Sequence, residues 1–150
     1  MIESSVKRRS PEQTKPWHPT SAAILLVDDE RLMRTSLKAT FSRWGYSVDV
    51  AVHGVEALDC LSRRTYDVII TDLQMPLMDG VSLWRRAKIA GHPGAWILMT
   101  GSAGSGIDCN MPILRKPFGL VELREAIESA ISGSEHLRIA DPFAQRGQSR

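Results

Sequence analysis

Apolar residues along the chain alternate between short continuous runs and runs at helical spacing. The continuous runs, such as "AAILLV" and "AWILMT", are typical of strands that are buried on both faces. One run, "YSVDVA", alternates apolar and polar residues instead. The sequence therefore predicts five strands, at residues 22–27, 46–51, 66–71, 95–100 and 111–116.

Between these strands, apolar residues recur every three or four positions, as on the buried face of a helix. The pattern predicts four helices, at residues 30–44, 54–64, 80–90 and 119–131. The residues expected to face the core are Met33, Leu37, Phe41 and Trp44 in the first helix, Val55, Leu58 and Leu61 in the second, and Leu120, Leu123, Ile127 and Ile131 in the last.

Strands that alternate with helices indicate an α/β fold, a doubly wound parallel sheet with helices on both faces. Residues 1–20 and 133–150 show little apolar periodicity, and the first of these segments contains three prolines. We therefore expect one domain at residues 21–132 with a flexible tail on each side.

Composition excludes several classes of protein. The net charge is +2 overall, but the two tails carry +2 and +1 while residues 21–132 carry −1. This weakly basic pattern does not indicate nucleic-acid binding. No apolar stretch approaches the ~20 residues that span a bilayer, and the polar first residues lack the apolar core expected of a signal peptide. We expect a cytoplasmic protein without a membrane partner, whose two cysteines are reduced thiols.

Candidate chemistry gathers where the predicted strands end. Asp28 and Asp29 directly follow the first strand, Asp72 the third, and Thr100 and Lys116 end the fourth and fifth. Taken alone, each has an ordinary explanation, since an Asp is often a helix cap, a Thr favours strands and a Lys is usually solvated. In a parallel sheet, however, all five side chains lie at one edge, where ligands bind.

Three carboxylates at one edge repel one another, and a divalent cation relieves that repulsion. Carboxylate oxygens are ligands that fit Mg²⁺. Asp28, Asp29 and Asp72 are therefore candidate ligands of a magnesium ion. The ammonium of Lys116 and the hydroxyl of Thr100 would hold an anion beside the metal. The combination suggests phosphoryl transfer onto a carboxylate, with Asp72 as the nucleophile.

Four motifs, "ILLVDDE", "VIITDLQMPLMDG", "ILMTG" and "LRKPF", resemble those of response regulator receiver domains in two-component signalling, over about residues 22–132. The resemblance implies a flavodoxin-like (βα)₅ fold with strand order 2-1-3-4-5. It also implies that Asp72 accepts a phosphoryl group from a histidine kinase or a histidine phosphotransfer protein. By the same motifs, the backbone carbonyl of Gln74 is a further Mg²⁺ contact, Thr100 bonds the phosphoryl oxygen and Lys116 pairs with it.

Two positions depart from the family's pattern. Ile113 stands where many members have an aromatic residue, so a ring-based switch is not expected. Residues 101–110 contain three glycines, and each costs a helix about 1 kcal/mol relative to alanine. We therefore expect a loop, or at most one helical turn, in place of the helix that the family has between its fourth and fifth strands.

The resemblance and the residues leave several alternatives open. The leading hypothesis is a phosphoacceptor that is not an enzyme in its own right and that signals to an unidentified protein partner. The second is a receiver-like scaffold that binds a partner without phosphorylation. The third is a hydrolase that acts through an aspartyl phosphate. Such hydrolases carry a second Asp, the general acid, two positions after the nucleophile, and that position is Gln74 here. The chain is a stand-alone receiver or a piece of a larger protein. Arg31, Arg34 and Lys38 on the first helix are candidate docking residues for the phosphoryl donor.

Overall fold

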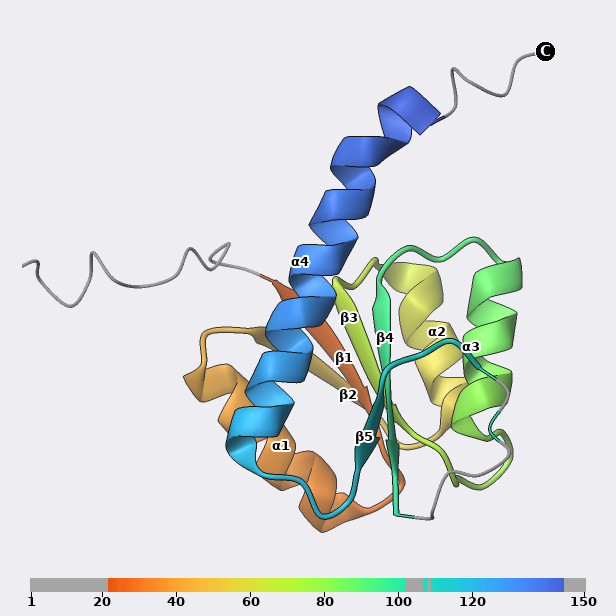
Figure 1. Ribbon diagram of the computed structural model, residues 1–150. Helices are drawn as coiled ribbons and strands as arrows, with labels where there is room; N and C mark the ends of the chain where they lie inside the picture. Colours follow the sequence, from red (N-terminus) through yellow and green to blue (C-terminus); the bar gives the residue numbers. More distant parts are fainter. Residues whose placement is uncertain (1–21, 102–106, 108, 145–150) are drawn as a thin grey trace, which may run out of the picture.

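The computed structural model describes residues 22–101, 107 and 109–144, and the side chains of the last helix as far as residue 133. Its centre is a sheet of five parallel strands in the order β2-β1-β3-β4-β5 (Figure 1). The strands are β1 (Ala23–Val27), β2 (Ser47–Ala51), β3 (Val68–Asp72), β4 (Ala95–Thr100) and β5 (Ile113–Arg115). The predicted α/β fold class and strand order are confirmed.

Four helices cover the sheet within the described residues. They are α1 (Arg31–Arg43), α2 (Gly54–Arg63), α3 (Gly80–Ile89) and α4 (Leu120–Ala144). Helices α1 and α4 lie on one face of the sheet, and α2 and α3 on the other (Figure 1). No helix lies between β4 and β5 among the residues described there, although most of the predicted loop, at 102–106 and 108, is outside the described part of the chain.

The continuous apolar runs have a simple explanation in the sheet. Successive side chains of one strand point to opposite faces, and both faces are covered. Ile24 and Leu26 of β1 pack toward α1 and α4, whereas Leu25 packs toward α2 and α3. All three are fully buried, so the strand has no solvent-facing side that would call for polar residues.

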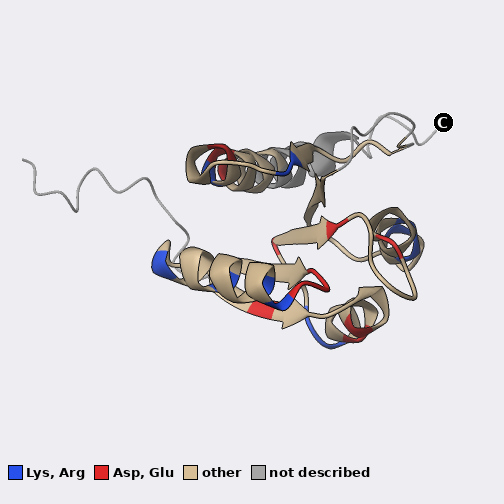
Figure 2. Ribbon diagram, turned by 90° about the horizontal axis from the view of Figure 1, so that it is seen from below, with Lys and Arg blue, Asp and Glu red and all other residues tan. Residues whose placement is uncertain are grey.

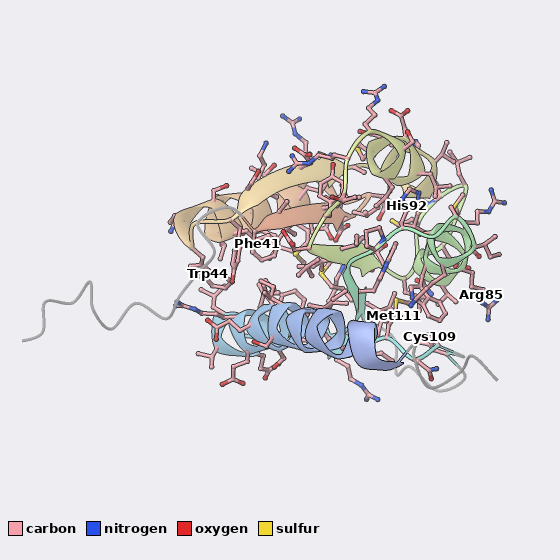
Figure 3. The ribbon with its side chains drawn as sticks, turned by 90° about the horizontal axis from the view of Figure 1, so that it is seen from above. Phe41, Trp44, Arg85, His92, Cys109 and Met111 are labelled. Carbon is pink, nitrogen blue, oxygen red and sulfur yellow. The ribbon has the colours of Figure 1, made fainter. Side chains whose placement is uncertain are left out.

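Helix α1 presents the face that its apolar spacing predicted. Leu37 and Phe41 are buried, and Met33 and Trp44 are partly buried against the same cluster. The rings of Phe41 and Trp44, labelled in Figure 3, lie 5.9 Å apart. The guanidinium of Arg124 from α4 lies 5.6 Å from the centre of the Trp44 ring. This contact joins α1 to α4 at one side of the sheet.

Two predicted core residues are exposed instead. Val55 is 50% exposed at the start of α2, and Leu120 is 59% exposed at the start of α4. Both lie in the first turn of their helices, beside the edge where the strands end. The sheet does not extend beneath these first turns, so it does not bury the two side chains. Ala57 fills the core position that the helical spacing had assigned to Val55.

The last helix is longer than the sequence predicted. It continues through Gly133 to Ala144, whereas the pattern had ended it at 131 and placed a tail from 133 onward. One glycine costs about 1 kcal/mol, which a helix that is already nucleated tolerates. Of the two predicted tails, at 1–20 and 133–150, residues 1–20 and 145–150 lie outside the described residues. None of the helices in the described part is long and apolar enough to span a bilayer.

Candidate functional site

The site lies at the edge of the sheet where the strands end. Asp28 follows β1, Asp72 is the last residue of β3, Thr100 is the last residue of β4, and Lys116 follows β5. Seen from the ends of the strands, acidic segments follow neighbouring strands (Figure 2). The parallel topology thus gathers residues that are up to 88 positions apart in the chain.

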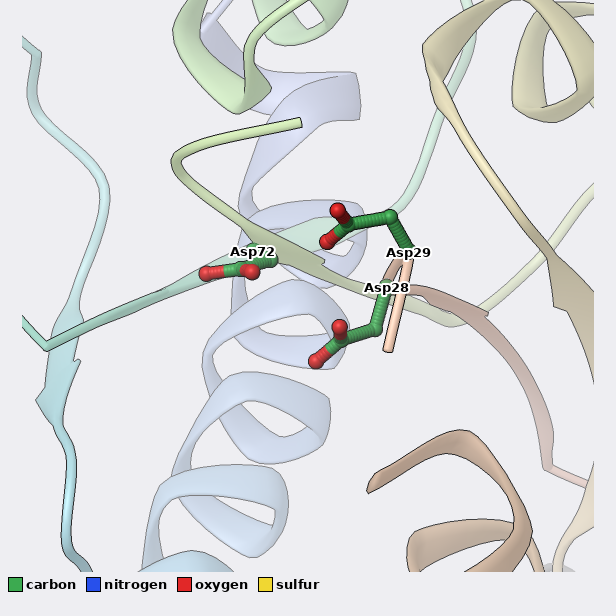
Figure 4. Close-up of side chains that lie close together, drawn as sticks. All are labelled: Asp28, Asp29 and Asp72. Atoms are coloured by element: carbon green, nitrogen blue, oxygen red, sulfur yellow. The ribbon is translucent and has the colours of Figure 1, made fainter. Parts of the chain in front are cut away.

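Three carboxylates form the centre of the site. Asp28, Asp29 and Asp72 each offer a carboxylate oxygen, and these oxygens lie within 4.8 Å of one another (Figure 4). Asp28 is fully buried, Asp72 is partly buried and Asp29 is exposed. The cluster therefore runs from the protein interior to the solvent, and an ion can reach it from the Asp29 side.

Lys116 balances part of the negative charge. Its Nζ lies 3.4 Å from Oδ2 of Asp28 and 3.4 Å from Oδ1 of Asp72. The backbone at Lys116 continues the β4–β5 ladder, because the Lys116 N–H donates to the carbonyl of Thr100 at 2.8 Å. The ammonium lies beyond the end of this ladder, between buried Asp28 and partly buried Asp72.

Asp28 is held from three directions. Its N–H donates to the Ala51 carbonyl at 3.2 Å, and its Oδ1 accepts from the Glu30 N–H at 2.8 Å. Its carbonyl accepts from Nη1 of Arg34 at 2.7 Å. Arg34 thus helps to hold the backbone at Asp28, the first residue of the acid pair Asp28 and Asp29. Sequence reasoning placed Arg34 on the surface as a docking residue, and no spacing rule identifies a bond from a guanidinium to a carbonyl six residues earlier.

The pKa of Asp72 is raised above its usual value. Burial is the main cause, the ammonium of Lys116 opposes it, and the negative charge of Asp28 adds to it. The Leu73 N–H donates to Oδ1 of Asp72 at 2.9 Å and also favours the ionised form. A divalent cation among the carboxylates would favour that form further and leave Asp72 ready to react.

The turn after β3 explains why the sequence reads Asp79-Gly80. Oδ1 of Asp79 accepts from the Ser82 N–H at 2.7 Å, so Asp79 is the cap of α3. The Gly80 N–H donates to the Leu73 carbonyl at 2.8 Å, and a Cβ at Gly80 would collide with the carbonyl oxygen of Asp72. Only glycine lets α3 start this close to the end of β3, a requirement that sequence reasoning missed.

The residues present fit a magnesium ion. The cluster offers only carboxylate oxygens, the hard ligands that Mg²⁺ prefers, and one of them is open to solvent, where an ion could keep its waters. Gln74 lies exposed in the turn after β3, and Thr100 is buried at the end of β4. All the residues that the sequence assigned to the site therefore belong to strand ends or to the turns that follow them.

Comparison with known proteins gives a consistent result. A family model for the response regulator receiver domain matches residues 24–128. Response regulator MprA of Mycobacterium bovis (strain BCG / Pasteur 1173P2) is 33% identical over 132 residues, which cover 84% of this chain and 57% of that protein. MprA of Mycobacterium sp. (strain KMS) is 37% identical over 106 residues, or 67% of this chain and 46% of the relative. The chain thus spans about half the length of these relatives.

Solved structures agree with the curated relatives. The receiver domain of sensor histidine kinase PA1611 from Pseudomonas aeruginosa PAO1, with a magnesium ion in its active-site cleft, is 28% identical at a TM-score of 0.70, covering 75% of this chain and 98% of that one. The response regulator TrrA of Thermotoga maritima, in complex with Mg²⁺-BeF, is 29% identical at a TM-score of 0.66, covering 72% and 97%.

Proposed function

Because the chain belongs to the response regulator receiver family, we propose that Asp72 accepts a phosphoryl group from a phosphohistidine of a histidine kinase or a histidine phosphotransfer protein. Receiver domains are signalling phosphoacceptors rather than classical enzymes. The observation that carries the proposal is the place of Asp72, a partly buried carboxylate beside Lys116 and within reach of two further acids.

The transfer needs no other nucleophile. A carboxylate oxygen of Asp72 attacks phosphorus, the bond between phosphorus and the donor imidazole nitrogen breaks, and the imidazole leaves with that electron pair and takes a proton. Lys116 pairs with the transferred oxygens, and the Thr100 hydroxyl donates to one of them. Water later attacks the same phosphorus and restores the carboxylate of Asp72.

In this proposal Mg²⁺ is held by Asp28, Asp29, Asp72 and the backbone carbonyl of Gln74. Two observations support it, the all-oxygen cluster here and the magnesium in the PA1611 and TrrA structures. When bound, the ion neutralises charge on the phosphoryl oxygens. Buried Asp28 holds its place through Arg34 and Glu30, so the acid pair does not have to rearrange as charge changes.

We place the donor at the start of α1, beside the acid edge. Arg31 is exposed there, and neighbouring Leu32 is 78% exposed, an apolar side chain that a partner could cover. Because the guanidinium of Arg34 donates to the Asp28 carbonyl, a substitution there would also disturb the acid site, and the test of docking leaves Arg34 unchanged. Arg31→Glu combined with Leu32→Ser should slow transfer from a cognate donor but leave labelling by acetyl phosphate unchanged. Equal slowing of both reactions would mean that the acid site itself is damaged.

Incubation with Mg²⁺ and acetyl phosphate, followed by intact mass measurement, tests the phosphoacceptor. Wild type should gain one phosphoryl group that is lost in mild base. Asp72→Asn should gain none, while the control Asp59→Asn, which changes an exposed acid on α2, should label fully. A full adduct on Asp72→Asn would contradict the assignment of Asp72.

A further inference from the structure

Strand β2 ends the sheet on one side, and within the described part of the chain its one partner strand is β1. The Ser47 N–H donates to the Ala22 carbonyl at 3.0 Å, and the Ala51 carbonyl accepts from the Asp28 N–H at 3.2 Å. In a parallel strand, the N–H and C=O of one residue point to the same side, and those of the next residue point to the opposite side. Ser47 and Ala51 face β1 in this way. The N–H and C=O groups of Val48 and Val50 therefore face away from the sheet.

This open stretch is bounded at both ends. The Tyr46 N–H donates to the Phe41 carbonyl at 3.1 Å, and the Val52 N–H donates to Oε2 of Glu56 at 3.4 Å. Among the hydrogen bonds of the described residues, none engages the outward groups of Val48 or Val50. Two residues thus present four backbone groups, the pattern to which an added strand binds.

A cavity of about 410 Å³ lies along this stretch, and side chains from both faces of the sheet line it. Lys38 reaches it from α1, while Arg63 and Arg64 reach it from the end of α2. We call Val48, Val50 and these three cations the β2 edge. Space beside the unpaired backbone is what a sixth strand requires.

The charge of the β2 edge is positive. Among the described residues that line the cavity, Asp49 is the single acid, against three cations. It already accepts from the Tyr66 hydroxyl at 2.7 Å and from Arg64 at 3.2 Å, and the Arg64 guanidinium lies 5.0 Å from the Tyr66 ring. Arg64 is thereby held in place, and Lys38 and Arg63 are exposed on opposite faces of the strand. Nη2 of Arg63 also lies 3.0 Å from Oδ2 of Asp59 on α2, an exposed ion pair of the kind that contributes little and leaves the guanidinium open to a partner.

We infer that the β2 edge binds an extended acidic segment of a partner protein, which adds to the sheet as a sixth strand beside Val48 and Val50. Side chains of an added strand alternate between the two faces, so acids on one face meet Lys38 and acids on the other meet the arginines. A second copy of this chain is the wrong occupant, because pairing two β2 edges would bring like charges together.

An acetylated and amidated peptide, Thr-Glu-Val-Glu-Glu-Val-Glu-Thr, is the probe, with fluorescein anisotropy and amide spectra of the labelled protein as readouts. Binding should shift and protect the amides of Val48 and Val50. A peptide with Gln for every Glu should bind at least about tenfold more weakly. Lys38→Glu and Arg63→Glu should weaken binding by a similar factor, whereas Arg86→Glu on α3, an equal change of charge elsewhere, should not.

Backbone methylation separates strand addition from general attraction to positive charge. Methylating alternate peptide nitrogens removes the donors on one side of the peptide while its charge stays the same. One of the two alternate sets should weaken binding roughly tenfold and the other should not. Equal binding of both methylated peptides, or protection of Val48 and Val50 that grows with protein concentration in the absence of peptide, would overturn the proposal.

Discussion

Two pairs of strands build the site, and they are anchored very differently. Strand β3 pairs with β4 over five residue positions, and all but the last residue of β3 are buried. Strand β5 pairs with β4 over only three, and two of its three residues are exposed. The first region supplies Asp72, next to Asp28 at the end of β1, while the second places Lys116.

The difference separates two tasks. Under the proposed function, the acids would hold a metal ion in a fixed geometry, and Asp28 and Asp72 lie at the ends of deeply buried strands. Under the same proposal, Lys116 would pair with an incoming phosphoryl group, and it follows the shortest strand, β5. Local opening is expected where buried contacts are few. The site is therefore rigid on its acidic side and adaptable on its basic side.

The largest expected effect compares core residues of the two regions. Ile70 in β3 is fully buried, and Ile70→Ala should lower the free energy of unfolding by about 4 kcal/mol. Leu114 in β5 lies nearer the surface, and Leu114→Ala should cost about 2 kcal/mol. Urea unfolding measures both losses in the free energy of unfolding, with one common value for its dependence on urea concentration. Ile113→Ala, at an exposed position of β5, is the control and should change stability by less than about 0.5 kcal/mol. Equal costs for Ile70 and Leu114 would remove the contrast.

Glycine at position 80 tests how tightly the rigid side is packed. Gly80→Ala places a methyl group against the Asp72 carbonyl and should cost about 2 kcal/mol, with slower labelling by acetyl phosphate. Gly101→Ala is the matched control, because no atom of the described residues, apart from its neighbours in the chain, lies within 4 Å of a Cβ added there. The thermal midpoint and the labelling rate should fall together in the first variant only. Normal labelling of Gly80→Ala would show that the turn after β3 yields easily.

Magnesium should stabilise the fold through the acids. At a Mg²⁺ concentration ten times the dissociation constant, the native state gains about 1.4 kcal/mol. Asp29→Ala should lose most of this gain and fold normally, since Asp29 is exposed. Thermal melts with and without Mg²⁺ measure the effect, and Asp59→Ala on α2 serves as a surface control. A wild-type response in Asp29→Ala would mean that the ion binds elsewhere.

The smallest effect is a pH dependence of the metal-free protein. The folded pKa of Asp72 is raised above its usual value of 3.8, so the folded state holds this proton more tightly than the unfolded chain does. Any stability that the protonated group contributes is therefore present below pH 3.8 and lost as the pH rises through the raised pKa. Wild type should lose stability relative to Asp72→Asn across this range. A difference between the two that stays constant with pH would contradict the raised pKa.

Much of this arrangement follows from the order of residue types along the chain. Apolar runs give the strands, helical spacing gives the faces of the helices, and a parallel sheet then brings the strand ends together. Asp28, Asp72 and Lys116 could be placed side by side on that basis alone. Such reasoning works because topology, and not side-chain detail, determines which strand ends meet.

Other features depend on contacts that no pattern encodes. The bond from Arg34 to the Asp28 carbonyl and the collision that excludes a side chain at Gly80 require knowledge of where the turns run in space. Val55 and Leu120 have the right spacing for the core, but they lie in first turns beyond the cover of the sheet. Periodicity identifies the face of a helix and says nothing about how far the sheet extends beneath it.

The equal spacing of Lys116 from Asp28 and Asp72 bears on how quickly the site exchanges ions. Without a positive charge beside it, a cluster of three carboxylates would attract a divalent cation more strongly. The ammonium of Lys116 lowers this attraction, because it repels the cation and neutralises part of the negative charge. Replacing Lys116 by a neutral residue should accordingly make a divalent cation bind more tightly and leave more slowly.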